Sequence, residues 1–119
     1  MRFVVPLLLL LFSSTLHSNS ITVRVVSIHD ADTIVILRDG QAETIRLKGI
    51  DCSEIDARAT KYAKEKLKGK NVVLKTYGKD KLNRTVADLF LENGNHFNKE
   101  LVRTGYCRWG RSRAMRIKD

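Results

Sequence analysis

The region from Ile21 to Lys48 constrains the fold of this chain most strongly, because it contains three β-strand patterns in close succession. Residues 21–28 alternate between two sets of side chains, residues 33–38 are rich in β-branched residues, and residues 43–48 alternate again. Asp39-Gly40 separates the second and third segments, and both residues tolerate the positive φ of a tight hairpin. The pattern predicts a three-stranded antiparallel meander, which can curl toward a barrel.

The pattern changes to a helical period after this meander. Residues 56–68 carry apolar side chains spaced near 3.6 with lysines on the other face, and Gly69 is expected to end this helix. Residues 71–77 and 85–91 predict a fourth and a fifth strand, and the polar residues 78–83 between them predict a loop.

A second helix is expected from about Asn98, as its N-cap, to Gly105, with Leu101 and Val102 on its apolar face. The expected fold is therefore α+β and mainly β: a five-stranded OB-type barrel with an inserted helix after the third strand and a second helix after the fifth. Barrels of this type often bind nucleic acids, but the fold alone does not fix the function.

The N-terminus has the three parts of a secretory signal peptide. A positive start, Met1-Arg2, precedes the apolar run at residues 3–12, and small and polar residues end at Ser20. The apolar run is too short to span a bilayer, although a membrane anchor or a buried first strand are alternatives. The expected organisation is a signal peptide at 1–20, one folded domain at 21–110 and a short basic tail at 111–119. This predicts a secreted or periplasmic protein with no stable membrane insertion after cleavage.

The formal net charge is +9, which indicates an acidic partner. Nucleic acid is the first candidate and an anionic membrane surface or cell wall is the second, and charge does not separate them. Two cysteines, Cys52 and Cys107, are too few for a disulfide scaffold. One bridge between them is allowed in an oxidising compartment, but the residues alone do not show that they meet.

Three carboxylates could form an oxygen-rich pocket if the barrel brings them together. Asp32 starts the second strand, and Asp51 and Glu54 lie where the third strand gives way to the helix. Hard cations such as calcium prefer oxygen ligands, and no His/Cys cluster has zinc spacing. In isolation, Asp32 is equally an ordinary turn residue, and Asp51 and Glu54 are equally a helix cap and a first-turn acid.

Two arginines flank these acids in the sequence. Arg46 lies on the third strand and Arg84 precedes the fifth. Guanidinium groups pair with phosphate and, with a cation, could stabilise a phosphodiester transition state, while Glu54 could orient or deprotonate water. As alternatives, Arg46 could pair with Glu43 and Arg84 could simply be solvated.

Taken in order, these motifs resemble the staphylococcal nuclease (thermonuclease) family over nearly the whole domain, from about Val23 to Arg108. The matching segments are Ile28-His29-Asp30-Ala31-Asp32-Thr33, Ile45-Arg46-Leu47-Lys48-Gly49-Ile50-Asp51-Cys52-Ser53-Glu54, Asp80-Lys81-Leu82-Asn83-Arg84 and Phe97-Asn98-Lys99-Glu100-Leu101-Val102-Arg103-Thr104-Gly105. Ala31 and Asn83 stand where the family has glycine, Ser53 replaces proline and Leu82 replaces tyrosine.

The resemblance implies a calcium-dependent endonuclease that hydrolyses DNA and RNA with little sequence preference and leaves 3′-phosphates. Asp32, Asp51 and the backbone carbonyl of Cys52 would hold Ca²⁺. Arg46, Glu54 and Arg84 would be catalytic. Lys81 and both arginines would contact the substrate. The expected protein is a bacterial monomer.

Two further expectations come from this resemblance. The family usually continues into another helix under the barrel, so the tail at 111–119 is short by comparison. In the family, the segment after the second helix runs close to the loop that carries Cys52, which makes a Cys52–Cys107 disulfide a hypothesis. The competing functions are a non-catalytic nucleic-acid-binding module on the same fold, an inactive truncated member, and a cell-surface protein that uses its charge for adhesion.

Overall fold

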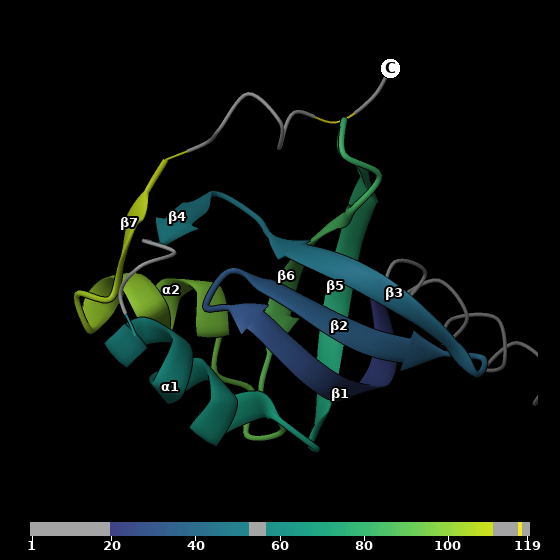
Figure 1. The fold of residues 1–119 in the computed structure, drawn as a ribbon, viewed down its shortest axis with the longest axis horizontal. Helices are drawn as coiled ribbons and strands as arrows, with labels where there is room; N and C mark the ends of the chain where they lie inside the picture. The colour runs from purple at the N-terminus through teal and green to yellow at the C-terminus, as the bar shows by residue number, and fades with distance from the viewer. Residues whose placement is uncertain (1–19, 53–56, 111–116, 118–119) are drawn as a thin grey trace, which may run out of the picture.

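A computed structural model of the chain describes residues 20–52, 57–110 and 117. Five strands form a closed barrel in the order β1-β2-β3-β6-β5, and a separate two-stranded sheet pairs β4 with β7 (Figure 1). The barrel strands are β1 (Ser20–Asp30), β2 (Thr33–Arg38), β3 (Gln41–Leu47), β5 (Asn71–Lys79) and β6 (Thr85–Phe90). The other elements are β4 (Ile50–Cys52), α1 (Ala57–Leu67), α2 (Phe97–Arg103) and β7 (Cys107–Trp109).

The mainly β fold with a five-stranded OB-type barrel and two helices is therefore confirmed. The strand ends differ from the sequence expectation by one or two residues, and Gly78–Lys79 extend β5 instead of belonging to the loop. A register shift lies between Thr76 and Gly78, and β5 continues past it. In the sequence, Gly78 resembles the start of a loop.

The meander begins the barrel and a parallel pair of strands closes it. Asp39 and Gly40 turn the β2–β3 hairpin with φ of 52° and 79°, as their sequence predicts. Two register shifts in β1 accompany the curvature that lets its first half pair with β5 and its second half with β2. β3 then pairs with β6 in parallel, from Ile45 opposite Thr85 to Leu47 opposite Ala87.

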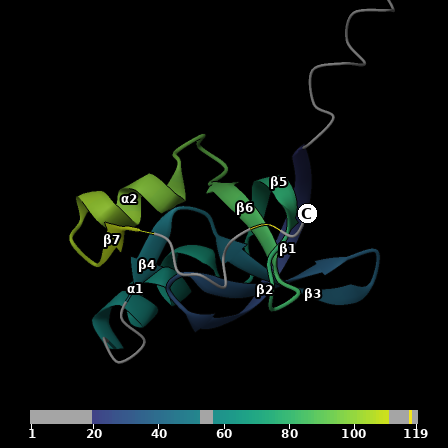
Figure 2. The same ribbon diagram turned by 90° about the horizontal axis from the view of Figure 1, so that it is seen from above.

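The barrel core consists of alternate strand residues and one face of α1. The fully buried aliphatic side chains include Ile34, Ile36, Ile45, Leu47, Leu74 and Leu89. Helix α1 buries Ala59, Ala63 and Leu67 against the barrel, which confirms its amphipathic assignment. Gly69 follows with φ of 77°, and its N–H donates to the carbonyl of Val25, so the end of the helix is bonded to β1. Figure 2 shows both helices on the same side of the barrel, away from the β2–β3 hairpin. Within the part of the chain that the structure describes, no helix is long and apolar enough to cross a membrane.

Asn98 is not the N-cap of α2. The helix begins at Phe97 and its N-cap residue is His96, whose side chain makes no capping bond. Asn98 is instead fully buried: its Oδ1 accepts from Leu89 N at 2.9 Å, and its Nδ2 donates to the carbonyls of Lys48 and Ala87. The side-chain amide of Asn98, which the sequence predicted to cap the helix, thus bonds to backbone groups of β6 and of the β3–β4 turn.

The small β4–β7 sheet was not predicted, because each strand has only three residues. Asp51 lies opposite Arg108 and Cys52 opposite Cys107 in an antiparallel register. A disulfide joins Cys52 to Cys107 across a sequence separation of 55 residues. The segment after α2 is thus covalently bonded to the strand that carries Asp51.

We expect Asn98→Ala to destabilise the fold by about 2–4 kcal/mol, because it removes the partner of the buried Leu89 N–H and of the Lys48 carbonyl. The carbonyl of Ala87 keeps its bond from Lys48 N. Urea denaturation would measure the loss of stability. Lys99→Ala, on the exposed face of the same helix, is the matched control and should change stability by less than about 0.5 kcal/mol. Equal effects of the two substitutions would contradict the role given to Asn98.

Reduction of the disulfide should lower the free energy of unfolding by roughly 3–4 kcal/mol, since the bridge restricts a long loop in the unfolded chain. Urea denaturation with and without dithiothreitol would measure the change, and Cys52→Ser/Cys107→Ser should not respond to the reductant. Two free thiols on titration of the denatured, unreduced protein would show that the bridge is absent.

Candidate active site and metal centre

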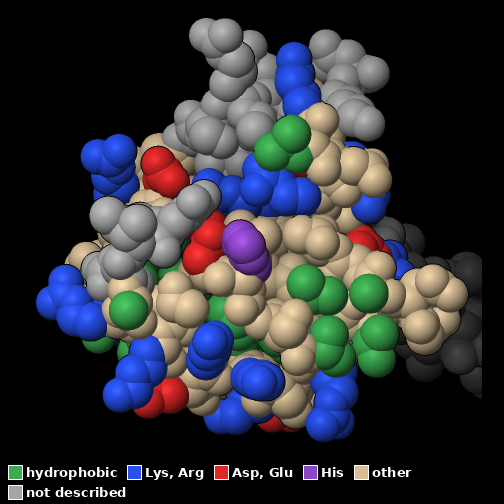
Figure 3. All heavy atoms as spheres, viewed as in Figure 1, with side chains coloured by type: hydrophobic (Ala, Val, Ile, Leu, Met, Phe, Trp, Pro, Cys, Tyr) green, Lys and Arg blue, Asp and Glu red, His purple; other side chains and the backbone are tan. Residues whose placement is uncertain are grey.

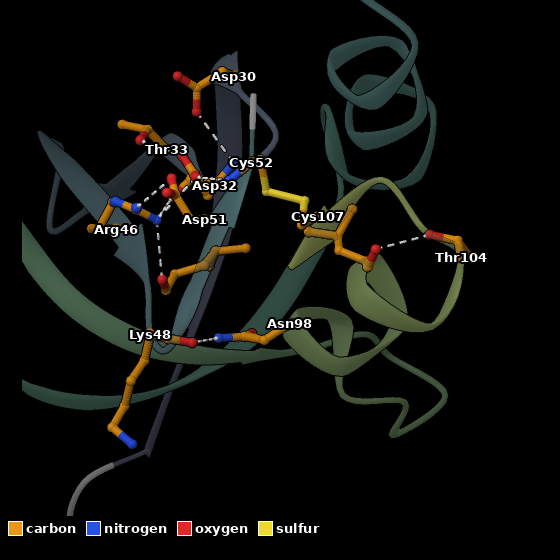
Figure 4. Close-up of a disulfide and its surroundings, with 12 residues drawn as sticks. Asp30, Asp32, Thr33, Arg46, Lys48, Asp51, Cys52, Asn98, Thr104 and Cys107 are labelled. Carbon is orange, nitrogen blue, oxygen red and sulfur yellow. Dashed lines mark hydrogen bonds and ion pairs between the residues drawn. A yellow bond between two sulfur atoms is a disulfide. The ribbon is translucent and has the colours of Figure 1, made fainter. Parts of the chain in front are cut away.

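Asp32 lies in the turn between β1 and β2, and its carboxylate is bonded on several sides (Figure 4). Its Oδ2 accepts from the backbone N–H of Cys52 at 2.8 Å, and its Oδ1 accepts from the hydroxyl of Thr33 at 3.1 Å. The preceding turn residue, Ala31, is buried and is not among the described non-glycine residues with positive φ, so alanine is accommodated there without strain.

Asp30 also belongs to this site, although its place in the sequence is typical of an ordinary turn residue. It is 4% exposed, and its Oδ1 accepts from the backbone N–H of Asp32 at 3.2 Å. Hydrogen bonding of an aspartate to a backbone N–H two residues ahead is common in turns. Its burial next to a second carboxylate could not be read from the sequence.

Arg46 extends from β3 toward both candidate metal ligands. Its Nη1 lies 3.2 Å from Asp32 Oδ2 and also donates to the carbonyl of Leu47 at 3.3 Å. Its Nη2 lies 3.9 Å from Asp51 Oδ1, which is beyond hydrogen-bonding distance. One end of the guanidinium is therefore fixed, and among the described residues no hydrogen bond holds Nη2.

The alternative pairing of Arg46 with Glu43 is wrong. Glu43 instead accepts from Arg38 at 2.9 and 3.1 Å and from the hydroxyl of Thr85 at 2.6 Å. These bonds lower the pKa of Glu43, against the effect of its partial burial. Arg46 is thus free to serve Asp32 and Asp51.

The two candidate ligands differ in their exposure. The Asp51 side chain is 44% exposed, whereas that of Asp32 is 5% exposed. Burial, followed by the hydrogen bond and charge of Asp30, raises the pKa of Asp32 to about 6, although the charge of Arg46 and the N–H of Cys52 act to lower it. The ionised form of Asp32 is therefore short of compensating positive charge.

This lack of positive charge fits a cation at the site. The oxygens of Asp32 and Asp51 and the adjoining backbone carbonyl of Cys52 are hard donors of the kind that calcium prefers. The described residues include no group of three or more His, Cys, Asp or Glu side chains arranged to hold a metal. A cation held here would thus depend on two carboxylates, a carbonyl and water. Glu54, the expected catalytic carboxylate, lies outside the described residues.

Arg84 is held by a different acid. Asp80 is fully buried, and its Oδ2 accepts from both Nε and Nη2 of Arg84 at 2.9 Å. The interpretation of Arg84 as merely solvated is therefore wrong. Asn83 adopts φ of 63°, which asparagine tolerates where the family has glycine.

The turn before β6 places Arg84 at the entrance to that strand. The next residue, Thr85, pairs with Ile45 of β3, one position before Arg46. In the described part of the chain, no hydrogen bond or ion pair joins Arg84 to Asp32, Arg46 or Asp51. Lys81 is exposed in the same turn.

The surface around the site has both signs of charge. On the face shown in Figure 3, acidic side chains lie beside a histidine near the centre, with lysine and arginine side chains above and below them. A basic surface attracts polyanions, and an acidic patch within it attracts a cation.

Known proteins of one family are similar to this chain. The family model described as staphylococcal nuclease homologue matches residues 44–118. A protein of Escherichia coli named an uncharacterized endonuclease is 30% identical over 109 residues, covering 88% of this chain and 71% of that protein.

Two other organisms also contain relatives of this chain. An uncharacterized protein of Methanocaldococcus jannaschii is 32% identical, covering 71% of this chain and 57% of that protein. The thermonuclease of Staphylococcus hyicus is 28% identical, covering 77% of this chain and 61% of the enzyme. The chain therefore belongs to the staphylococcal nuclease family.

Proposed function

We propose that this protein is a calcium-dependent nuclease that hydrolyses phosphodiester bonds of DNA and RNA with little sequence preference and leaves 3′-phosphates. The observation that carries the proposal is the position of Arg46, a buried guanidinium between Asp32 and Asp51 whose Nη1 is fixed and whose Nη2 has no hydrogen bond within the described residues. The family membership and the endonuclease and thermonuclease names of the relatives support the same reaction.

Asp32, Asp51 and the carbonyl of Cys52 would hold the calcium ion. When bound, the ion supplies positive charge to a phosphoryl oxygen and to the attacking water. The hydrogen bond from Cys52 N to Asp32 fixes the buried carboxylate against β4, so both acids face the same space. This pre-organisation lowers the cost of gathering like charges.

Arg46 would stabilise the negative charge that develops on the phosphate oxygens. Its Nη1 is held by Asp32 and by the carbonyl of Leu47, so the plane of the guanidinium is set before substrate arrives. The donors at Nη2 are left for the phosphate, at a position next to Asp51. Donors fixed in advance act without reorganisation in the transition state.

We assign supporting roles to three more residues. Arg84 would supply a second guanidinium, oriented by the buried Asp80, and Lys81 would contact the nucleic-acid backbone from the same exposed turn. Glu54 would orient or deprotonate the attacking water, as the family resemblance implies.

We also propose that the protein acts outside the cytoplasm as a monomer, with residues 1–20 as its signal peptide and residues 21–110 as the nuclease domain. The Cys52–Cys107 disulfide supports this, because such bonds persist in oxidising compartments. Without residues 1–20 the chain loses only the charge of Arg2, and the remaining net charge of 9 − 1 = +8 favours encounter with nucleic acid there.

Arg46→Ala should reduce cleavage of single-stranded DNA in millimolar calcium by roughly 100-fold or more, because it removes a charge-stabilising donor. Arg24→Ala is the matched control: it removes the same charge from an exposed position on β1, six residues from Asp30. Chelation of calcium should abolish cutting by the unmodified protein and by the control.

Circular dichroism would establish that each variant is folded, and Arg46→Lys tests the guanidinium separately from its charge. A folded, unmodified protein that shifts DNA in a gel but never cuts it would instead identify a binding module. Full activity of Arg46→Ala would overturn the assignment of Arg46.

The raised pKa of Asp32 predicts how metal-free stability depends on pH. The folded state binds a proton at Asp32 with a pKa of about 6, above the ordinary value of 3.8. A group of this kind stabilises the fold progressively as pH falls through 6. In a chelator, the stability of the unmodified protein relative to Asp32→Asn should therefore rise by about 1 kcal/mol between pH 7 and pH 5.

Urea denaturation at the two pH values measures this difference. Subtracting the stability of the variant cancels the contributions of the other titrating groups, which both proteins share. Calcium at pH 7 should stabilise the unmodified protein more than Asp32→Asn. A relative stability that is constant with pH would show that Asp32 is not short of positive charge.

A further inference from the structure

Strand β7 carries a third arginine to the candidate site. Arg108 lies opposite Asp51 in the antiparallel β4–β7 pair, between the pairs Cys52–Cys107 and Ile50–Trp109. Residues directly opposite each other in such a pair point to the same face of the sheet. Arg108 therefore shares the face of Asp51, while the adjacent disulfide lies on the other, buried face.

Asp51 lies between two guanidinium groups. Arg46 Nη2 is 3.9 Å from its Oδ1, and Arg108 Nη2 is 3.9 Å from its Oδ2. The side chain of Arg46 is 5% exposed, whereas that of Arg108 is 83% exposed. Neither contact is short enough for a hydrogen bond. Among the described residues Arg108 has no closer partner, and its exposure lets a ligand approach it from solvent.

The surface beside Arg108 is hollowed. A cavity of about 500 Å³ is lined by Asp51, Cys52, Gly105, Tyr106, Cys107 and Arg108. Its volume lies in the range of small-molecule sites. Asp51 and Arg108 both line this cavity, so a nucleotide bound there would lie within reach of Arg108.

We propose that Arg108 is a substrate-positioning residue that binds a backbone phosphate next to the scissile one. This rests on the proposed nuclease function of the site. Arg46, buried at Asp32, meets the reacting phosphate, and the exposed Arg108 orients the strand that enters the cavity. An arginine is suited to this because its fork of donors matches two phosphate oxygens.

The Cys52–Cys107 disulfide fixes the position of Arg108 relative to β4. A two-stranded sheet of three-residue strands has little stability alone. The bridge lies one residue before Arg108 on β7 and one residue after Asp51 on β4 (Figure 4). Opening it frees β7 from the strand that presents Asp51, so reduction should remove the contribution of Arg108 to substrate binding.

The decisive experiment measures binding without cleavage. Fluorescence anisotropy of a labelled single-stranded oligonucleotide with the full chain in chelator gives Kd over a range of salt concentrations. Arg108→Ala should weaken binding about tenfold and reduce the slope of log Kd against log salt by about one phosphate contact. Arg103→Ala is the matched control, because Arg103 is 72% exposed on α2 and carries the same charge.

Equal Kd values and equal salt slopes for Arg108→Ala and Arg103→Ala would overturn the proposal, because they would show a general charge effect. Arg108→Lys should restore part of the affinity but not all of it. Circular dichroism checks that the exposed substitutions leave the fold intact.

The same assay tests the disulfide. Dithiothreitol should weaken binding by the unmodified protein to the level of Arg108→Ala and leave that variant unchanged, at protein concentrations and temperatures where both remain folded. A similar loss in the variant would show that the bridge acts on binding without Arg108 and would overturn the positioning role.

Cleavage in calcium separates this proposal from the nuclease proposal. Arg108→Ala should raise KM about tenfold with kcat within a few-fold, as expected for loss of binding that is uniform between ground and transition states. If the unmodified protein never cuts, the nuclease proposal fails, and the binding measurement still decides the role of Arg108. A KM equal to that of Arg103→Ala would count against Arg108 alone.

Discussion

The carboxylate of Asp32 connects three parts of the chain that are distant in sequence, and the candidate site depends on it. It accepts from Cys52 N on β4, pairs with Arg46 on β3 and holds its own turn through Thr33. These bonds bring β4 against the mouth of the barrel. The cost is a buried charge that Arg46 only partly compensates, which raises the pKa of the carboxyl group. The same shortage of positive charge suits the site to a cation.

A second set of contacts joins α2 and β7 to the barrel. Asn98 bonds to the backbone of β6 and to the carbonyl of Lys48, and the Cys52–Cys107 disulfide fixes the segment that follows the helix. One of these is a buried amide and the other a covalent bond, so neither depends on a large apolar surface. A small barrel buries a limited core, and such specific links contribute a large share of its stability.

Much of the site could be predicted from the order of its motifs, but not the partner of each side chain. Arg46 was expected to bind phosphate or to pair with Glu43. The structure excludes the second pairing, because Glu43 bonds to Arg38 and Thr85. Arg84 was expected to bind phosphate or to be solvated, and the structure shows that the buried Asp80 holds it. Partner choice depends on which residues face each other across strands, and a single segment carries no such information.

The sequence by itself determined the five barrel strands, the amphipathic α1 helix and the Asp39-Gly40 hairpin, because each depends on local periodicity or on a backbone angle that few residues adopt. It also determined the oxygen-rich character of the site through its residue types. Only the tertiary structure decided the parallel closure of β3 on β6, the burial of Asn98, and the pairing of β4 with β7 that brings Arg108 to Asp51. These features join residues far apart in the chain, and their bonds exist only after the barrel has closed.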